Sequence, residues 1–269
     1  MKKIAIHSVP RSGSSWVGQI FNSSPDVIFR FQPLFSYAFK DYLDANSSKE
    51  EIERFFHLIT QSKDDFLLQN DKVEKGIYPI FSKNDNPTHI VYKEVRYHHI
   101  LENMLNVDPD VIVVGIVRNP YAVINSFLNA PREFRKDLGW DELEEWRYAQ
   151  KKNMNRSEEF FGYEKWKEVA LLFQKLEERY PKSFYLLHYD VLLENMQKEV
   201  ENLFNFCEID MSEQTKEFLL QSTKNDKPDT YSVYKKKSAD TGWKRSLNSI
   251  IIDEITKDLK DSGLEEYLV

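Results

Sequence analysis

The sequence predicts an α/β fold with three layers, α/β/α, in which a central parallel sheet lies between two layers of helices. Two observations lead to this prediction. Short apolar runs typical of buried strands alternate along the chain with longer stretches in which apolar residues recur at helical spacing. Basic and hydroxylic residues follow several of these runs directly, and in parallel sheets ligands bind beyond the carboxyl ends of the strands.

Five apolar runs are predicted to form the strands. They cover residues 4–6, 26–31, 88–96, 111–117 and 183–189. The fourth run reads Val-Ile-Val-Val-Gly-Ile-Val, and an unbroken run of mostly β-branched residues is typical of a strand that is covered on both faces. This run is therefore expected to lie inside the sheet.

Helical periodicity follows most of these runs. The predicted helices lie after residue 13, at 50–59, around 101–105, at 121–128, 164–180 and 191–206, and around 250–255. A charged region with tryptophans at 132–156 is predicted to be helical and to lie on the surface. The rest of 34–86 has no clear pattern, and the polar stretch 223–240, with three lysines at 235–237, is predicted to be a solvated loop.

Composition restricts the class of protein. The 269 residues contain no Gly/Ser-rich or Pro-rich linker, so one domain over 1–269 is expected. The net charge of −7 argues against a general nucleic-acid binder, and any anionic ligand must be held by a local basic cluster. The single cysteine, Cys207, lies among apolar residues, which predicts a core thiol without disulfides in a reducing compartment.

No segment suggests export or membrane insertion. Met1-Lys2-Lys3 is followed by too few apolar residues for a signal peptide, and no apolar run approaches the roughly 18 residues that a membrane span needs. We therefore expect no stable membrane insertion and a cytoplasmic location. The sequence does not indicate an oligomeric state.

The loop after the first run is the clearest candidate binding element. It contains Arg11, Gly13 and three serines, and helical spacing begins directly after it. A helix N-terminus has unpaired backbone N–H groups and a dipole that favours an anion. Serine hydroxyls and a guanidinium add further donors. The loop is therefore predicted to bind a phosphate or sulfate group, although a simple helix cap is the alternative.

The loop differs from that of a P-loop NTPase. Such proteins carry Lys-Ser or Lys-Thr after the last glycine of the loop, and none follows Gly13. Their second site strand ends in a carboxylate that helps to hold magnesium, whereas the run at 111–117 ends at Arg118. Arginine side chains thus stand at positions where an NTPase would have its metal site. We therefore predict no metal ligands and a metal-independent reaction.

Four segments together resemble the sulfotransferases that use 3′-phosphoadenylyl sulfate (PAPS). Residues 10–16, Pro-Arg-Ser-Gly-Ser-Ser-Trp, resemble the 5′-phosphosulfate loop of the family, and residues 117–126 resemble the 3′-phosphate segment, with Arg118 and Ser126 eight residues apart. Tyr189 falls in a Tyr-Glu-Asp-like position, and residues 242–245 resemble a late basic segment. The order of the segments also matches. Among these enzymes, the motif Arg-Ser-Gly-Ser-Ser is most similar to that of the carbohydrate sulfotransferases.

The resemblance implies a P-loop NTPase-like sulfotransferase fold and specific roles. Arg11 would neutralise charge on the leaving phosphate, and Lys93 would touch the transferred sulfuryl group. The remaining donor-binding positions would be Ser12, Gly13, Ser14 and Ser15 on the phosphosulfate, Trp16 on adenine, Arg118 and Ser126 on the 3′-phosphate, and Tyr189, Lys244 and Arg245. Core packing for Trp16 and a solvated face for Lys244 and Arg245 are the alternatives.

The general base is not evident from the sequence. The carbohydrate branch has Glu-Pro after the second strand, whereas this chain has Gln32-Pro33, and a neutral amide cannot accept the proton. Glu94 and His98 are candidates because they lie at or beyond a strand end, although an ion-paired Glu94 and a packed His98 are alternatives. Asp41 and Glu102 also stay open.

The predicted activity is transfer of the sulfuryl group from PAPS to an acceptor hydroxyl, such as that of a carbohydrate or glycolipid, or to an amine. The second product would be adenosine 3′,5′-bisphosphate (PAP). The predicted partner is thus a small-molecule or glycan acceptor. Two alternatives remain, a P-loop nucleotide or nucleoside kinase and a non-catalytic nucleotide-binding module.

Overall fold

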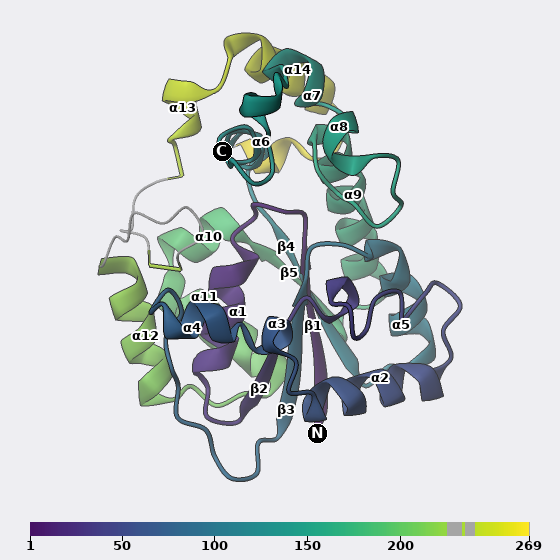
Figure 1. Cartoon of the computed structure of the whole chain (residues 1–269), viewed down its shortest axis with the longest axis vertical. Coiled ribbons are helices and arrows are strands. Elements are labelled where there is room, and N and C mark those ends of the chain that lie inside the picture. Colours follow the sequence, from purple (N-terminus) through teal and green to yellow (C-terminus); the bar gives the residue numbers. More distant parts are fainter. Residues whose placement is uncertain (225–232, 235–239, 269) are drawn as a thin grey trace.

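A computed structural model of the chain describes residues 1–224, 233–234 and 240–268 (Figure 1). Its central sheet has five strands in the order β2-β3-β1-β4-β5, and every neighbouring pair is parallel. The strands are β1 (Lys2–Ser8), β2 (Val27–Phe31), β3 (His89–Glu94), β4 (Val111–Val117) and β5 (Phe184–His188). This arrangement confirms the predicted three-layer α/β fold.

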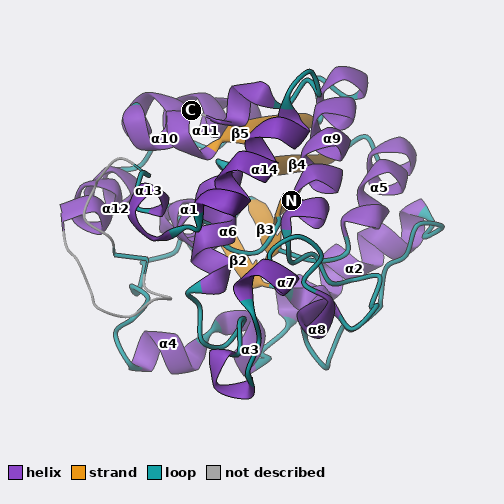
Figure 2. Ribbon diagram, turned by 90° about the horizontal axis from the view of Figure 1, so that it is seen from above, coloured by secondary structure: helices purple, strands orange, loops and turns teal. Residues whose placement is uncertain are grey.

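Helices cover both faces of the sheet, as Figures 1 and 2 show. One layer contains α1 (Ser14–Ser23), α10 (Tyr189–Glu194), α11 (Met196–Cys207) and α12 (Glu213–Lys224). The opposite layer contains α2 (Lys49–Gln61), α5 (Leu101–Val107) and α9 (Tyr163–Arg179). Beyond the carboxyl ends of the strands lie α6 (Pro120–Leu128) and α14 (Ser249–Leu259).

Several short helices complete the described chain. They are η1 (Pro33–Phe35), α3 (Asp65–Leu68), α4 (Asn70–Glu74), η2 (His98–Ile100), η3 (Lys136–Leu138), α7 (Glu142–Glu145), α8 (Gln150–Asn153), α13 (Trp243–Ser246) and η4 (Glu265–Leu268). Within the described ranges, no helix is both long enough and apolar enough to cross a membrane.

The sheet separates two apolar cores. Ile4 and Ile6 of β1 pack with α1 and α11, whereas Ala5 belongs to the core on the side of α2, α5 and α9. Alternate side chains of a strand point to opposite faces, so covering both faces makes the inner strands apolar throughout. A side chain at Gly115 would lie 2.7 Å from Phe173 of α9, so glycine permits this close approach.

The predicted element boundaries need four corrections. The first strand is longer than 4–6 because His7, although polar, is buried with hydrogen-bonding partners. The third strand ends at Glu94 rather than at residue 96. The last strand ends at residue 188, and Tyr189 begins α10. The helix expected at 191–206 is interrupted at Asn195, whose φ of −123° and ψ of 44° are not helical.

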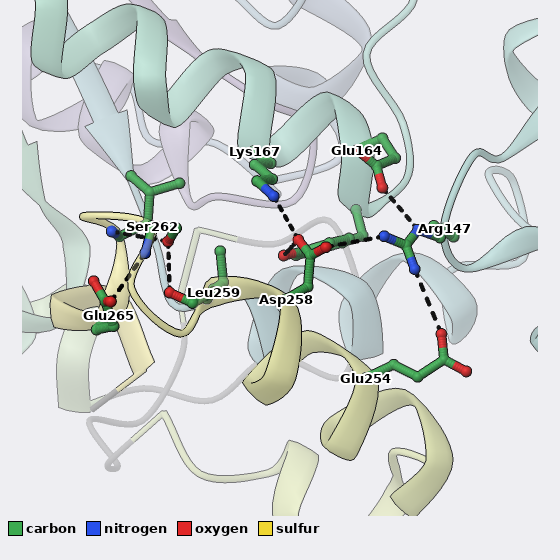
Figure 3. Close-up of polar contacts among 10 residues, drawn as sticks. Arg147, Glu164, Lys167, Glu254, Asp258, Leu259, Ser262 and Glu265 are labelled. Carbon is green, nitrogen blue, oxygen red and sulfur yellow. Dashed lines mark hydrogen bonds and ion pairs between the residues drawn. The ribbon is translucent and has the colours of Figure 1, made fainter.

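The prediction of a helical surface region at 132–156 is wrong in part. Its helical content is limited to η3, α7 and α8, and Trp146 is buried. The indole of Trp146 packs on Tyr163 of α9 with ring centroids 5.7 Å apart. Beside it, the guanidinium of Arg147 pairs with Glu164 of α9 and with Glu254 and Asp258 of α14 (Figure 3). Lys167 of α9 also binds Asp258, at 2.6 Å. Charged contacts thus join this region to two helices.

Two histidines form a buried polar pair in the core on the side of α2, α5 and α9. The Nδ1 atoms of His7 and His98 are 3.1 Å apart, and Nε2 of His7 lies 3.2 Å from the hydroxyl of Tyr92. Burial, together with the nearby charges of His99 and Lys93, lowers the pKa of His7 to about 3. The folded protein therefore keeps His7 neutral at a pH where an unfolded histidine binds a proton.

The buried, neutral His7 is therefore expected to make the protein less stable in acid. Because the unfolded state binds the proton, the free energy of unfolding should fall below the ordinary histidine pKa of 6.5, by about 1.4 kcal/mol per pH unit for one proton. Urea unfolding between about pH 6.5 and 5 measures this slope. His7→Gln should flatten it and the exposed His57→Gln should not; equal slopes would contradict the assignment.

Candidate active site

The loop between β1 and α1 leaves the start of the helix open to a ligand. Gly13 is the N-cap residue of α1, and no side chain caps this end of the helix. Its φ of +83° favours glycine, and a Cβ here would lie 2.1 Å from Cε2 of Tyr189. Both the backbone conformation and the ring of Tyr189 therefore require glycine at this position.

The serines of this loop supply a donor that the protein itself does not satisfy. Ser12 is fully buried, and its Oγ has no hydrogen-bond partner within the described part of the chain. A buried hydroxyl without a partner costs stability, about 1–3 kcal/mol, and such groups are expected where a ligand completes the hydrogen bonding. Ser14 is buried and Ser15 is partly exposed. The loop therefore fits an anion such as a phosphosulfate.

Two predicted arginines lie together at the carboxyl ends of β1 and β4. Nη1 of Arg118 donates to the carbonyl oxygen of Arg11 at 2.7 Å. Nε of Arg11 in turn donates to Oγ of Ser126 on α6 at 3.0 Å. The structure thus brings together the loop after β1 and the segment from Arg118 to Ser126, which lie more than 100 positions apart in the chain.

Unusual backbone conformations follow three neighbouring strands. Arg11, Gln32 and Tyr97 lie shortly after β1, β2 and β3, and their φ angles are +72°, +42° and +57°. A residue other than glycine in this region costs of order 1 kcal/mol or more, and such strain concentrates at functional sites. These three residues lie at one edge of the sheet, next to the loop after β1.

The second part of this edge surrounds Lys93. Its ammonium lies 4.5 Å from the centroid of the Phe31 ring, and Nζ of Lys72 on α4 lies 4.8 Å from the same centroid. Nζ of Lys72 also donates to the hydroxyl of Tyr78 at 3.3 Å. Two ammonium groups that share one ring favour an anion beside them.

Burial lowers the pKa of the Lys93 ammonium to about 7. The neighbouring Glu94 carboxylate opposes this shift, and the charges of Lys72, Arg96 and Arg11 add to it. Four cations from the loop after β1, α4 and the end of β3 are thus close enough to influence one another. An anionic ligand would relieve their repulsion and raise this pKa.

Gln32 is held by a buried ion pair. Nη1 of Arg96 donates to Oε1 of Gln32 at 3.0 Å, and Nε of Arg96 lies 3.1 Å from Oε2 of Glu159. The guanidinium also lies 3.9 Å from the centroid of the Phe35 ring. The position that carries a glutamate in the carbohydrate branch is therefore occupied by an amide fixed against a cation.

The two main candidates for the general base are both buried. Glu94 is 0% exposed and its Oε1 accepts a hydrogen bond from the backbone of Val95; burial raises its pKa to about 7. His98 is 1% exposed and packs against Phe160 and Phe173. Within the described part of the chain, Oε2 of Glu94 and Nε2 of His98 have no hydrogen-bond partner, so each side chain keeps one unsatisfied polar atom.

The other two candidates also have partners. Glu102 pairs with Lys175 and Arg179 of α9. Oδ1 of Asp41 accepts a hydrogen bond from the hydroxyl of Tyr97 at 2.9 Å. Asp41 is exposed and its partner Tyr97 lies shortly after β3, so of the two residues Asp41 is better placed to act as the general base.

Trp16 and Tyr189 lie against the loop. The indole of Trp16 is 8% exposed, its Nε1 donates to Oγ of Ser222 on α12 at 3.0 Å, and its ring contacts Tyr189 edge-on. The centroid of the Tyr189 ring lies 5.0 Å from Cζ of Arg118. Packing accounts for the indole, and Tyr189 joins the loop to Arg118.

Lys244 and Arg245 are exposed on α13, and within the described ranges neither forms an ion pair. The lysines at 235–237 lie outside the described residues. Instead, Asp240 is the described residue of this late segment that reaches Arg118.

Comparison with known proteins agrees with this geometry. A family model described as "Sulfotransferase family" matches residues 3–213, which include the loop after β1, all five strands and α6. The chain belongs to the sulfotransferase family. No curated protein sequence matches this sulfotransferase.

Solved structures show the same fold at low sequence identity. The mouse sulfotransferase SULT7A1, complexed with PAP, is 12% identical; the alignment covers 99% of this chain and 87% of that one, with a TM-score of 0.58. Retinol dehydratase, in a complex with retinol and PAP, is 15% identical over 96% and 80%, with a TM-score of 0.54. A sulfotransferase domain from the Synechococcus PCC 7002 olefin synthase is 17% identical over 91% and 88%, with a TM-score of 0.50.

Sequence reasoning missed four polar residues of this sulfotransferase site. Lys72 and Glu159 lie in regions without a recognisable pattern, and Arg96 was part of a predicted strand. Asp240 precedes the basic segment, but nothing in its surroundings indicates that it faces Arg118. Within the described residues, no cluster of three or more histidine, cysteine, aspartate or glutamate side chains could hold a metal ion.

Proposed function

We propose that this sulfotransferase transfers the sulfuryl group of PAPS to an acceptor hydroxyl or amine and releases PAP. The observation that supports this most directly is the set of contacts that joins Arg11, Ser126 and Arg118. A basic group beside the loop and a second one at the end of β4 suit a nucleotide that carries anionic groups at both its 5′ and 3′ positions. The same contacts argue against a kinase, because Arg118 stands where magnesium would need a carboxylate.

The loop after β1 would hold the phosphosulfate end of the donor. The unpaired hydroxyl of Ser12 and the uncapped start of α1 provide donors there. The donor supplies an activated sulfuryl group. Arg11 and Lys93 would stabilise negative charge on the transferred and leaving groups, and Arg118 with Ser126 would bind the 3′-phosphate. No divalent ion is needed in this scheme.

The acceptor would approach over the aromatic residues at the end of β2. Phe35 and Phe66 are 43% and 37% exposed, and their ring centroids are 6.0 Å apart. Phe66 contacts Phe31, on which the ammonium of Lys93 rests. This row of rings leads from the surface to the proposed position of the sulfuryl group and suits an acceptor with an apolar face, including the face of a sugar ring. A cytoplasmic location remains part of the proposal.

Thermal shift assays test the donor class directly. PAP alone should raise the melting temperature, whereas ATP with magnesium should have little effect, because binding to the folded state stabilises it. The reverse result would favour a kinase. Transfer of labelled sulfate from PAPS to a panel of alcohols, phenols, sugars and amines then separates an enzyme from a non-catalytic nucleotide-binding module.

The pH dependence of transfer tests the role of Lys93. With a pKa of about 7, the free enzyme loses this charge as the pH rises, so kcat/KM for PAPS should fall above about pH 7. Lys93→Arg should remove this decline, since arginine stays protonated. The same alkaline decline in both proteins would contradict the role. If the variant is inactive, the pH dependence of PAPS binding by calorimetry gives the same comparison.

A further inference from the structure

The guanidinium of Arg118 already forms an ion pair with a carboxylate of the protein, that of Asp240. Nε of Arg118 donates to Oδ2 of Asp240 at 2.6 Å, and Nη2 donates to Oδ1 at 2.5 Å. The third nitrogen, Nη1, is bonded to the carbonyl oxygen of Arg11. Two parallel N–H donors are the arrangement with which arginine binds a carboxylate or a phosphate. Asp240 therefore uses the same donors that a 3′-phosphate would need.

The segment that follows Asp240 is anchored beside the site. The ring of Trp243 packs on Tyr121 with centroids 4.5 Å apart, and Oγ of Ser246 donates to Oδ1 of Asn125 at 2.9 Å. Both partners belong to α6, the helix that carries Ser126. These contacts hold Asp240 near Arg118 and raise the local concentration of its carboxylate.

The ion pair is also well shielded. The side chains of Arg118 and Asp240 are 17% and 16% exposed, so solvent weakens their attraction less than that of a surface pair. A second carboxylate, Asp190, lies close by and accepts a hydrogen bond from the backbone of Asn119 at 3.2 Å. Burial and the charge of Asp240 both raise the pKa of Asp190, so these two acidic groups lie close enough to influence each other beside Arg118.

We propose that Asp240 is an internal competitor of the 3′-phosphate and must leave Arg118 before PAPS or PAP can bind fully. The inference rests on the proposed function of Arg118. A nucleotide with a 3′-phosphate displaces the carboxylate, whereas a nucleotide without one does not need to. The return of Asp240 to Arg118 would in turn assist the release of PAP. The device is built into the chain and requires no other partner.

Calorimetry with two nucleotides tests this competition. In Asp240→Asn, which keeps the shape but loses the charge, the affinity for PAP should rise by roughly tenfold, the size expected for one charge-assisted contact. The affinity for adenosine 5′-monophosphate, which has no 3′-phosphate, should not change. Asp253→Asn removes the same charge from an exposed position of α14 and should leave both affinities at the wild-type value.

Each other outcome has a distinct meaning. A lower PAP affinity in Asp240→Asn would overturn the proposal, because Asp240 would then orient Arg118 for the phosphate rather than compete with it. An unchanged PAP affinity would also overturn it, as would an equal gain for both nucleotides. If the wild-type protein and the variant both fail to bind PAP, the proposed function itself fails, and this inference with it.

Discussion

Replacing Arg118 with alanine is expected to lower the affinity for PAP by roughly 100-fold, or about 3 kcal/mol, which corresponds to the loss of two charge-assisted hydrogen bonds to one phosphate. The affinity for adenosine 5′-monophosphate should change by less than about threefold, since that nucleotide offers no group to this guanidinium. Calorimetry with both nucleotides measures the difference.

The control for this variant is Arg54→Ala, which removes the same side chain from an exposed position of α2. It should bind both nucleotides nearly as the wild-type protein does. Arg118 also donates to the backbone of Arg11, so its loss can loosen the loop as well. An equal loss for PAP and adenosine 5′-monophosphate would point to that indirect effect and remove the assigned role in 3′-phosphate binding.

Replacing Arg11 with alanine is expected to lower the turnover of PAPS by about 10²- to 10³-fold, the usual effect of removing one group that stabilises developing charge. Binding of PAP should weaken much less, because the backbone of the loop and Arg118 remain. Steady-state rates and calorimetry on the same protein separate the two effects. The decisive comparison is therefore between turnover and PAP binding.

Arg11→Lys is the matched variant. A lysine keeps the positive charge and could also donate a proton to the leaving phosphate, so turnover should recover to within about tenfold of the wild-type rate. The variant would lose the hydrogen bond that Nε of Arg11 donates to Oγ of Ser126 at 3.0 Å. A variant Arg11→Ala that binds PAP poorly but turns over normally at saturation would contradict a role in the chemical step.

Most of the fold could be predicted because its signals are local. A buried parallel strand requires an apolar run, and a helix on a sheet requires apolar residues at helical spacing, so β4 and α9 are recognisable from their own residues. The misplaced boundaries have tertiary causes. His7 extends β1 because His98 and Tyr92 satisfy its ring nitrogens, and Trp146 is buried because it packs on Tyr163 of α9.

The donor side of the site was predicted more completely than the acceptor side. Arg11 and Arg118 follow strands directly, and parallel strands place their carboxyl ends at one edge, so their proximity follows from chain order. The acceptor side depends on Lys72, Gln32, Arg96 and Glu159, which come from short helices and turns without periodicity. The proposed bases illustrate the limit, since sequence position alone does not reveal that Glu94 and His98 are buried.

The three-layer α/β architecture and the basic residues at the ends of β1 and β4 can be recognised from the sequence, since both depend on residues within a few positions of one another. Which side chains face each other across the site depends on the packing of distant segments. Asp240 meets Arg118 across 122 positions, and two lysines share the ring of Phe31. Such contacts form between distant segments, so the pattern of residues next to them in the chain does not indicate them.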